Sequence, residues 1–305
     1  MTLTVLATGA LSTIQDQGRV GWAAVGVSRS GAADRGALRL ANRLVGNPPD
    51  AAGLEVTMGG LALRAEAPVV LALTGASGPA TVDGRGVVQG AAVRLATGQS
   101  LTIGAPVVGL RTYVGVRGGL AVPAVLGSRS TDTLAGIGPE PLREGDVLPV
   151  GSPGGPPSDA EAPDVIDPRG PLVRVVLGPR DDRFPAASVD GLLRQPWRVG
   201  VRSDRIGVRL EAIGSTRIRA KDAGTGDGDG DGDEPPSEGV VRGAVQVPPS
   251  GQPTVFGPDH PVTGGYPVIA VVIDADADLL GQVRPGDLVR FARVSLRPVS
   301  FGASR

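Results

Sequence analysis

Cysteine is absent from this chain of 305 residues, and lysine and histidine occur once each, as Lys221 and His260. The missing cysteine excludes a thiol nucleophile, a disulfide and a cysteine-ligated metal centre. A single histidine excludes a histidine-rich metal centre, and we expect no metal site. Lys221 lies in Lys-Asp-Ala-Gly, which is neither the Gly-Lys-Ser/Thr of a phosphate-binding loop nor the methionine-flanked lysine of a biotin carrier. Any ATP or biotin must therefore be brought by another chain.

Aromatic residues make up 3% of the chain, no polybasic run occurs, and the formal net charge is −1. We therefore exclude nucleic acid as a partner, because its binding needs a basic patch and often aromatic side chains for base stacking. No apolar run reaches the roughly 18 residues needed to cross a bilayer. Met1-Thr-Leu-Thr-Val leads into a strand-like segment without the basic start of a signal peptide. We expect no membrane association, a cytoplasmic location, and a core of Val, Leu, Ile and Ala.

Glycine (48) and proline (28) separate many short runs of Val, Leu and Ile. This pattern predicts a mainly β fold with many turns and a few short helices. We place a first β unit at 1–150, a Gly/Pro-rich linker at 151–170 and a second β unit at 171–305. The second unit carries an acidic insertion at 222–236. Its Gly-Asp alternation over Gly224–Glu234 suggests calcium, but it lacks the final glutamate ligand and the flanking helices, so we interpret it as a disordered insertion.

One short pattern occurs near the end of each proposed unit. Leu142-Arg-Glu-Gly-Asp-Val-Leu148 and Val283-Arg-Pro-Gly-Asp-Leu-Val-Arg-Phe291 both read apolar-Arg-X-Gly-Asp-apolar. Such short patterns also arise by chance in turns. They nevertheless favour two structurally related β units.

The strongest helix prediction is Asp34–Val45, where apolar residues recur at helical spacing. Asp34 is a suitable N-cap, and Gly46-Asn-Pro-Pro stops the helix. Arg35, Arg39 and Arg43 form a stripe on its other face, which is either solvated or a partner interface. Three further helical segments are expected: a short helix at Ser188–Leu193, one or two turns at Asp274–Leu280, and a short helix capped by Ser128 or Ser130.

The stretch Gln246–Tyr266 combines many prolines and glycines with polar side chains. Prolines restrict φ and glycines permit positive φ, so the stretch is a shaped, rigid loop system. It displays Gln246, Gln252, Asp259, His260 and Tyr266. Rigid loops with convergent polar groups build binding sites on β scaffolds. The alternative is an ordinary turn region of a barrel.

Several motifs, in the same order along the chain, resemble those of the biotin-dependent carboxyltransferase family. This family includes the C-type subunits of 5-oxoprolinase, the antagonist KipA and subunit 2 of the allophanate hydrolase type. The resemblance extends from about residue 3 to residue 294. The matching motifs are Leu11-Ser-Thr-Ile-Gln-Asp-Gln-Gly-Arg19, Leu38-Arg-Leu-Ala-Asn-Arg-Leu-Val-Gly-Asn47, Gly127-Ser-Arg-Ser-Thr-Asp132, Ser203-Asp-Arg205, Gln246-Val-Pro-Pro and Thr263-Gly-Gly-Tyr266.

The resemblance implies two cyclophilin-like β-barrel domains and an active surface near their junction. It implies a KipI-like B-type protein as partner, together with a LamB/YcsF-like A-type protein, in an ATP-dependent 5-oxoprolinase that opens the lactam of 5-oxoproline to glutamate. One alternative is the carboxyltransferase subunit of a urea or amide carboxylase, with biotin on a separate carrier. Another is a non-catalytic antagonist that binds a KipI-like protein. In each case ATP acts through the assembled complex and no cofactor is bound covalently to this chain.

Activation of an amide or lactam requires donors aimed at its carbonyl oxygen and an acceptor for its N–H. An arginine fork suits a carboxylate through two parallel hydrogen bonds, and His260 could titrate near neutrality. For each candidate residue the alternative is turn capping or a structural salt bridge. The candidate catalytic residues are Asp16, Arg129, Asp204 and Asp259, and the candidate substrate-binding residues are Gln15, Arg19, Arg205, Gln246, Gln252 and Tyr266.

Overall fold

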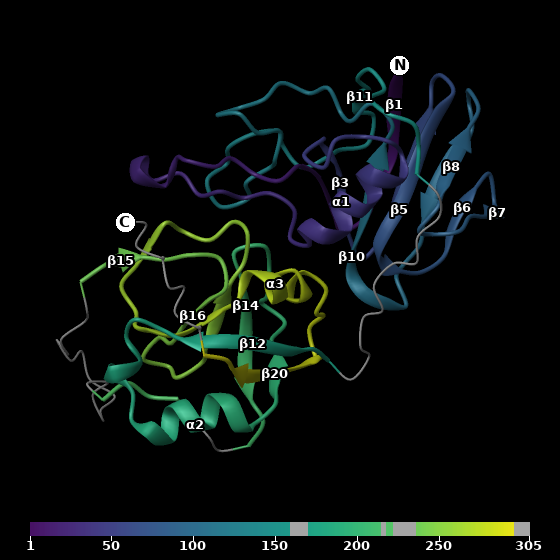
Figure 1. Ribbon diagram of the computed structural model, residues 1–305. Coiled ribbons are helices and arrows are strands. Elements are labelled where there is room, and N and C mark those ends of the chain that lie inside the picture. The colour runs from purple at the N-terminus through teal and green to yellow at the C-terminus, as the bar shows by residue number, and fades with distance from the viewer. Residues whose placement is uncertain (159–169, 215–217, 222–235, 296–305) are drawn as a thin grey trace, which may run out of the picture.

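The computed structural model describes residues 1–158, 170–214, 218–221 and 236–295. Within these ranges the chain forms two β domains, one above the other in Figure 1. The prediction of a mainly β fold with a few short helices is confirmed. Residues 159–169 of the predicted linker and 222–235 of the predicted acidic insertion lie outside the described residues, so the interpretation of Gly224–Glu234 stays a prediction.

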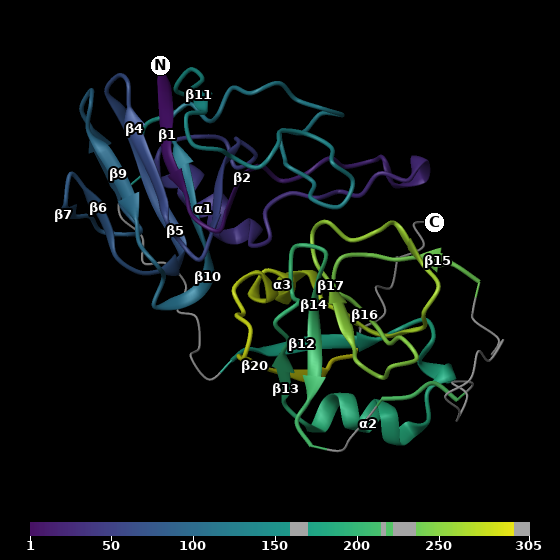
Figure 2. The same cartoon turned by 180° about the vertical axis from the view of Figure 1, so that it is seen from behind.

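The first domain consists of two antiparallel sheets packed face to face. One sheet has the strand order β11-β1-β4-β9-β6-β7 and the other β2-β3-β10-β5-β8 (Figure 2). Many of these strands alternate buried and exposed side chains, as Leu61–Ala65 does, which is typical of a strand with one face against a core. The strands are β1 (Thr2–Thr8), β2 (Leu11–Gln15), β3 (Gly53–Thr57), β4 (Leu61–Ala65), β5 (Val69–Ser77), β6 (Ala80–Val82), β7 (Arg85–Gly86), β8 (Ala92–Leu95), β9 (Ser100–Ile103), β10 (Val108–Val116) and β11 (Val147–Pro149).

The second domain is a closed barrel in the order β12-β19-β16-β17-β14-β13-β20. A parallel pairing of β20 with β12 completes the ring. Closure by hydrogen bonds leaves this barrel without an open sheet edge. The strands are β12 (Leu172–Leu177), β13 (Trp197–Val199), β14 (Gly207–Ala212), β16 (Ala244–Gln246), β17 (Thr254–Phe256), β19 (Val268–Val272) and β20 (Leu288–Arg293), and a separate two-stranded sheet pairs β15 (Glu238–Gly239) with β18 (Thr263–Gly264).

Each domain has its own apolar core. The main core of the first domain lies between the two sheets and contains only aliphatic side chains, as expected from the scarcity of aromatic residues. The second core differs from that expectation, because Phe184, Trp197 and Phe291 lie in it. Trp197 is fully buried, and its indole N–H donates to the carbonyl of Leu192 at 3.0 Å. This bond attaches a helix to the outside of the barrel.

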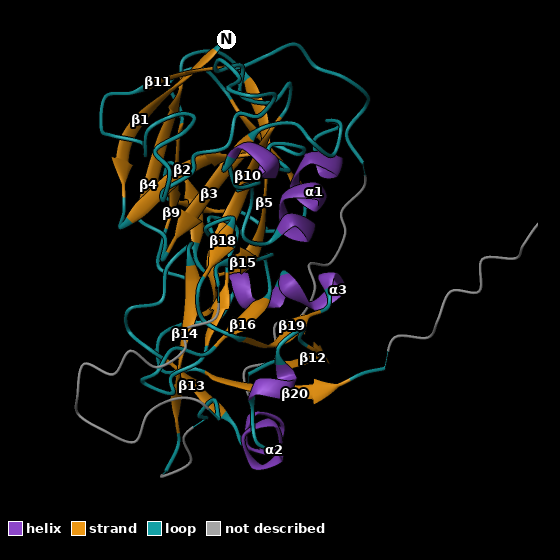
Figure 3. Ribbon diagram, turned by 90° about the vertical axis from the view of Figure 1, so that its left-hand side faces the viewer, coloured by secondary structure: helices purple, strands orange, loops and turns teal. Residues whose placement is uncertain are grey.

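Three α-helices accompany the sheets, and Figure 3 shows α3 between the other two. They are α1 (Arg35–Leu44), α2 (Ala186–Arg194) and α3 (Asp274–Ala277), and α3 is followed by the 3₁₀ turn η3 (Leu279–Gly281). The predictions for all three segments are confirmed, and the Asp34 carboxylate accepts from the Ala37 N–H as the expected N-cap of α1. Helix α1 packs closely on β10, where a Cβ on Gly115 would lie 2.6 Å from the Ala41 carbonyl oxygen. No helix in the described ranges has the length and apolar character to cross a membrane.

The repeated Arg-X-Gly-Asp pattern forms the same turn in both domains. The Asp146 carboxylate accepts from the Arg143 N–H at 2.8 Å, and the Asp287 carboxylate accepts from the Arg284 N–H at 2.8 Å. The intervening glycines have φ values of 90° and 94°, which a residue with a side chain would adopt only at a cost. In each domain the turn leads directly into the last strand, β11 or β20.

Candidate interdomain site

The start of α1 docks against α3 and η3 through charged groups. Arg35 is buried and pairs with Asp274, while the Gly36 N–H donates to the Asp278 carboxylate at 2.9 Å. Arg39 stays half exposed, 3.9 Å from Asp278. The expected stripe of three arginines is therefore divided, because Arg35 is buried at the interface between the domains whereas Arg43 is exposed.

Arg205 is the centre of this interdomain junction. Its Nε and Nη2 donate to the two oxygens of Asp259, each at 2.8 Å, and its Nη1 donates to Glu55 of the first domain at 2.5 Å. Nη2 also donates to the carbonyl of Gly31 at 2.8 Å. The side chain is 2% exposed, so these bonds replace the water that the guanidinium loses.

Asp259 is fully occupied by its partners. Besides Arg205, it accepts from the Ser30 hydroxyl at 2.6 Å and from the N–H and hydroxyl of Thr133 at 2.9 and 2.8 Å. Ser30 and Thr133 belong to the first domain, so this single carboxylate of the second domain binds two of its loops. Asp259 cannot take up a proton as a general base without breaking one of these bonds.

Glu55, which was not among the predicted site residues, shares the buried position. Its carboxylate accepts from the Ala33 N–H and the Tyr113 hydroxyl, both at 2.8 Å, and lies 3.3 Å from the Arg111 Nε. The sequence did contain a signal, because Glu55 is the one charged residue in the otherwise apolar strand Gly53–Thr57. A glutamate is almost never buried without a partner, so its position in that strand indicates a buried ion pair. Its partner Arg205 is 150 residues away in sequence, so the local pattern did not identify the pair.

A second cluster forms around Asp16 within the first domain. Its carboxylate accepts from the hydroxyls of Ser128 and Ser130 at 2.7 and 2.6 Å, and from the N–H groups of Arg129 and Gly18 at 2.6 and 2.7 Å. The prediction that Ser128 or Ser130 caps a helix is wrong: the described residues 127–137 contain no helix, because both hydroxyls turn to Asp16 instead.

Arg19 and Gln15 extend this cluster. Arg19 is 1% exposed, donates to the carbonyl of Ser130, and lies 3.8 Å from the carboxylate of Asp132. The Gln15 amide donates to the carbonyl of Thr131 at 2.9 Å. The Ser30 hydroxyl, which donates to Asp259, also lies 3.1 Å from that same carbonyl, so the Asp16 cluster and the Arg205 junction form one continuous polar region.

The side chains of the remaining predicted residues have other surroundings, although the Arg129 N–H belongs to the Asp16 cluster and Asp204 directly precedes Arg205. The Gln246 amide donates to the carbonyl of Tyr266 at 2.9 Å, and the Tyr266 side chain is 41% exposed. Gln252 is exposed on the loop between β16 and β17. The Arg129 side chain donates through Nε to the carbonyl of Val122 at 2.7 Å. Asp204 is exposed and accepts from the N–H groups at 206 and 207, so its carboxylate shapes the turn before Arg205.

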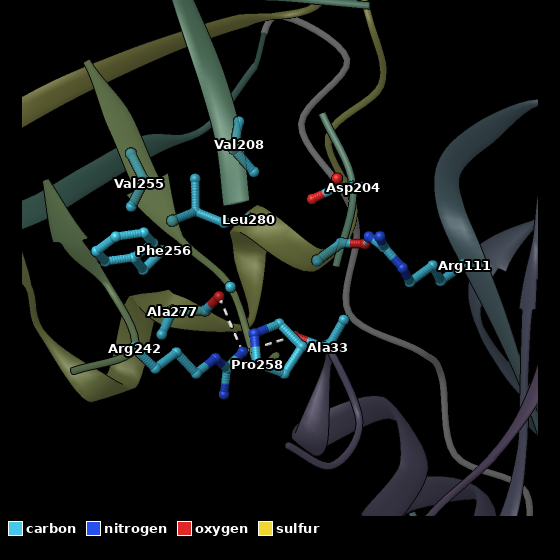
Figure 4. A pocket seen from close by; sticks show the side chains of 12 residues that line it. Ala33, Arg111, Asp204, Val208, Arg242, Val255, Phe256, Pro258, Ala277 and Leu280 are labelled. Atoms are coloured by element: carbon cyan, nitrogen blue, oxygen red, sulfur yellow. Dashed lines mark hydrogen bonds between the residues drawn. The ribbon is translucent and has the colours of Figure 1, made fainter. Parts of the chain in front are cut away.

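Asp204 also borders a small cavity between the domains. The cavity measures about 20 Å³, room for roughly one water molecule. Figure 4 shows Asp204 and Arg111 on one side of it, and Val208, Val255 and Phe256 on the other. Arg242 lies at its base and donates to the carbonyl of Ala33 across the interface. Of the predicted site residues, Asp204 is the one that lines this cavity.

The charges of the junction are stabilised by one another. Burial by itself raises the pKa of Glu55 and of Asp259. The Arg205 guanidinium and the other hydrogen-bond donors together outweigh burial, so both pKa values lie below their usual range. Burial likewise opposes protonation of Arg205, yet Glu55 and Asp259 raise its pKa. The region therefore keeps its ion pairs throughout the neutral range. Burial lowers the pKa of His260, which favours its neutral form near pH 7 over the titration expected there.

Comparison with known proteins gives a consistent result across nearly the whole chain. A family model described as carboxyltransferase domain, subdomain A and B, matches residues 25–293. The chain is 39% identical over 297 residues to the C subunit of 5-oxoprolinase from Escherichia coli (strain K12), covering 96% of this chain and 92% of that protein. It is 33% identical over 322 residues to urea amidolyase of Lachancea kluyveri, covering 99% of this chain but 17% of that protein. The crystal structure of Kluyveromyces lactis urea carboxylase superposes with a TM-score of 0.89 at 30% identity, over 96% of this chain and 27% of that one.

Proposed function

We propose that this chain, which belongs to the family of carboxyltransferase domains with subdomains A and B, is the C-type subunit of an ATP-dependent 5-oxoprolinase. The observation that carries the proposal is the 39% identity to the C subunit of the Escherichia coli 5-oxoprolinase, which covers 92% of that protein. The match therefore extends over nearly the full length of that subunit. The urea amidolyase match spans only 17% of a much longer chain.

The proposed reaction adds water to the lactam of 5-oxoproline, breaks the ring C–N bond and gives glutamate, with hydrolysis of ATP as the driving force. This chain lacks a phosphate-binding loop, which fits a division of labour within a complex. We propose a KipI-like B-type protein and a LamB/YcsF-like A-type protein as the other members. The complex would act in the cytoplasm, where ATP is supplied.

Burial distinguishes the predicted residues that position the loops of the site from those that could contact the substrate. Asp16, Asp259, Arg19 and Arg205 are each at most 7% exposed, and the two carboxylates have their oxygens occupied. We propose that these four position the loops of the site. Asp204 is exposed beside the interdomain cavity, so it is the better candidate for accepting a proton or binding an amide N–H.

The exposed or partly exposed Arg129, Gln252 and Tyr266, together with the buried Gln246, remain candidates for contact with the substrate. We propose Arg129 as a clamp for the substrate carboxylate, since one side-chain nitrogen is used by Val122 and a guanidinium has further donors. Gln246, Gln252 and Tyr266 remain proposed contacts for a planar amide.

The second candidate is a carboxyltransferase that acts on urea or another amide, with biotin on a separate carrier. The observation in its favour is the TM-score of 0.89 with the Kluyveromyces lactis urea carboxylase. The absence of a methionine-flanked lysine in this chain fits a carrier on another chain.

The test is reconstitution. The chain is co-purified with its B-type and A-type partners, and glutamate formation from 5-oxoproline and ATP is measured. We expect glutamate only when all three proteins are present. No glutamate, together with urea-dependent ATP turnover after addition of a biotin carboxylase and a biotin carrier, would establish the second candidate instead.

The role of Asp204 is tested by Asp204→Asn in the same complex. Asparagine keeps the acceptor oxygen that caps the turn at Ile206 and Gly207, but it removes the charge. We expect kcat to fall at least ~100-fold, the usual size of a general acid–base contribution, while the complex still forms. Asp190→Asn on α2, also an exposed acid, is the matched control and should leave kcat unchanged. Equal activity of the two variants would remove Asp204 from the mechanism.

A further inference from the structure

An arm whose tip is apolar and uncharged extends from the first domain beside the interdomain site. We define the arm as residues 17–30, which follow β2, and residues 121–138, which lie between β10 and β11. In Figures 1 and 2 the purple segment after β2 runs away from the sheets, above the second domain. The two parts of the arm touch at the tip, where the Trp22 indole N–H donates to the carbonyl of Leu126 at 3.1 Å.

The tip of the arm exposes apolar side chains without any charge among them. The sequence has no charged residue at 20–28, 118–128 or 133–139. Exposed apolar side chains gathered without charge mark a site of interaction with another protein. The exposed large side chains are Val20 (70%), Trp22 (39%), Val25 (70%), Val125 (40%), Leu126 (36%) and Leu134 (46%).

The backbone of Leu126 has a positive φ, which is an unfavourable conformation for a leucine at the tip of the arm. Val125 and Ser128 pair across a two-residue turn whose central residues, Leu126 and Gly127, have φ values of 53° and 80°. Turns with positive φ at both central residues favour Asn, Asp or Gly at the first of them. The Leu126 backbone is strained in this position and the residue is 36% exposed, so local stability does not explain why a leucine occupies the turn.

The base of the arm is held rigid by the Asp16 cluster. The two sides of its first part are joined by a hydrogen bond from the Arg19 N–H to the Arg29 carbonyl at 2.8 Å, and the Ser28 hydroxyl donates to Asp132 at 2.7 Å. The buried Asp16 carboxylate fixes residues 128–130 of the second part. A patch presented on a pre-organised base loses little entropy when it binds.

The comparisons indicate what covers the arm. The related region forms 92% of the length of a separate subunit but 27% of the single chain of urea carboxylase. In the long chain the covalent link holds this region beside its neighbouring modules. As a separate protein the same region needs a surface that binds its neighbour without that link, and an uncharged apolar tip supplies it.

From these observations we propose that the tip of the arm, centred on Trp22 and Leu126, is the docking surface for the B-type subunit. The partner surface is apolar and uncharged, and it accepts the indole and the leucine as anchors. This inference rests on the proposed function, because it takes the B-type partner from there. It adds the surface through which that partner is bound.

The binding experiment uses the full chain and its purified B-type partner in a calorimetric titration. We expect Trp22→Ser and Leu126→Asn each to weaken binding by at least ~30-fold, the size of an interface hot spot. Leu126→Asn is the decisive variant, because asparagine suits the turn and its Tm should not fall below that of the wild type. Val88→Asp changes a 72% exposed valine at the far β7 hairpin and should leave the affinity unchanged.

Fluorescence gives an independent readout. The protein has two tryptophans, of which Trp197 is fully buried and Trp22 is 39% exposed. Binding should therefore shift the emission to shorter wavelength and reduce acrylamide quenching, and both changes should vanish in Trp22→Phe. An unchanged spectrum on binding would contradict docking at the arm.

The outcomes separate this inference from the proposed function. If the wild type and both arm variants bind the B-type partner equally, the complex stands and the docking surface is wrong. If the chain alone forms a dimer that Leu126→Asn dissociates in sedimentation, the arm is a self-association surface and the inference is also wrong. If the wild type does not bind the B-type partner at all, the proposed function fails, and the inference that rests on it fails too.

Discussion

Replacement of Arg205 by methionine tests the central physical claim about the interdomain junction. The variant Arg205→Met removes the cation between Glu55 and Asp259 and keeps an apolar side chain of similar length. Glu55 still has Arg111 at 3.3 Å, but Asp259 keeps only the neutral donors Ser30 and Thr133. At least one buried carboxylate is thus left without a compensating charge.

The expected cost follows from burial. Arg205, Glu55 and Asp259 have side-chain exposures of 2%, 1% and 0%, so solvent does not screen the lost interaction. Removal of one partner from a buried ion pair typically destabilises a protein by about 3–5 kcal/mol. That is a large fraction of a total stability of about 5–15 kcal/mol. We expect urea denaturation at pH 7 to show a loss in this range, and Arg209→Ala on the exposed face of β14 to change stability by less than about 0.5 kcal/mol.

The pH dependence of the stability lost in Arg205→Met identifies the cause of the loss. In the wild type the pKa values of Glu55 and Asp259 are lowered, so their stabilisation is present above the ordinary values of 4.5 and 3.8 and is lost as the pH falls. In Arg205→Met the same carboxylates are buried without the guanidinium, so burial raises their pKa and protonation relieves the variant as the pH falls. Both effects reduce the difference in the free energy of unfolding between the wild type and Arg205→Met as the pH falls from 7 to 4.

Two outcomes would refute this reasoning. One is a loss below about 1 kcal/mol at pH 7, the size of an ordinary surface ion pair. The other is a difference in stability between the wild type and Arg205→Met that stays the same from pH 7 to pH 4. The double variant Arg205→Met/Asp259→Asn provides a further check, because it removes the charge that the single variant leaves buried, and it should be more stable than Arg205→Met.

Two other predictions concern the N-cap of α1 and the base of the arm. Burial raises the pKa of Asp34 from an ordinary 3.8 to about 6, so its charge costs up to about 3 kcal/mol (2.2 × 1.36) above pH 6, and this cost disappears as the pH falls toward 4. Thermal unfolding should therefore show the wild type gaining stability relative to Asp34→Asn between pH 7 and pH 4, and parallel pH curves would contradict the assignment. Gly138→Ala should destabilise by about 2 kcal/mol or more, because φ is +92° and the added Cβ would lie 2.1 Å from the Ser130 carbonyl that binds Arg19. Gly136→Ala, with φ +63° and nothing within 4 Å, carries the conformational cost alone and should lose only about 1 kcal/mol, so an equal loss in both variants would show that the contact with Ser130 is unimportant.

Local features of this protein follow from local sequence. Helix α1 begins after Asp34 and ends before Gly46 because capping and periodicity act over a few residues. The two Arg-X-Gly-Asp turns form the same hydrogen bond because each is closed by its own aspartate. Composition likewise predicted the mainly β fold.

The site depended on contacts that no local pattern encodes. Asp204 and Arg205 are adjacent in sequence, yet one is exposed beside a cavity and the other is buried between two carboxylates. Arg35 and Arg43 lie on one predicted stripe, yet Arg35 is buried against Asp274 of the second domain and Arg43 is exposed. The position of Gln246 and Tyr266 away from Asp16 was likewise set by the arrangement of the domains.

What the sequence alone determined, therefore, was the set of elements, the excluded chemistries and the family motifs. Only the tertiary structure decided which charged groups are buried, which oxygens are already occupied and which apolar side chains remain exposed at Trp22 and Leu126. The physical reason is range: hydrophobic periodicity and capping act between neighbours, whereas a buried charge is stabilised by whatever partner the fold brings to it, here across 150 residues from Glu55 to Arg205.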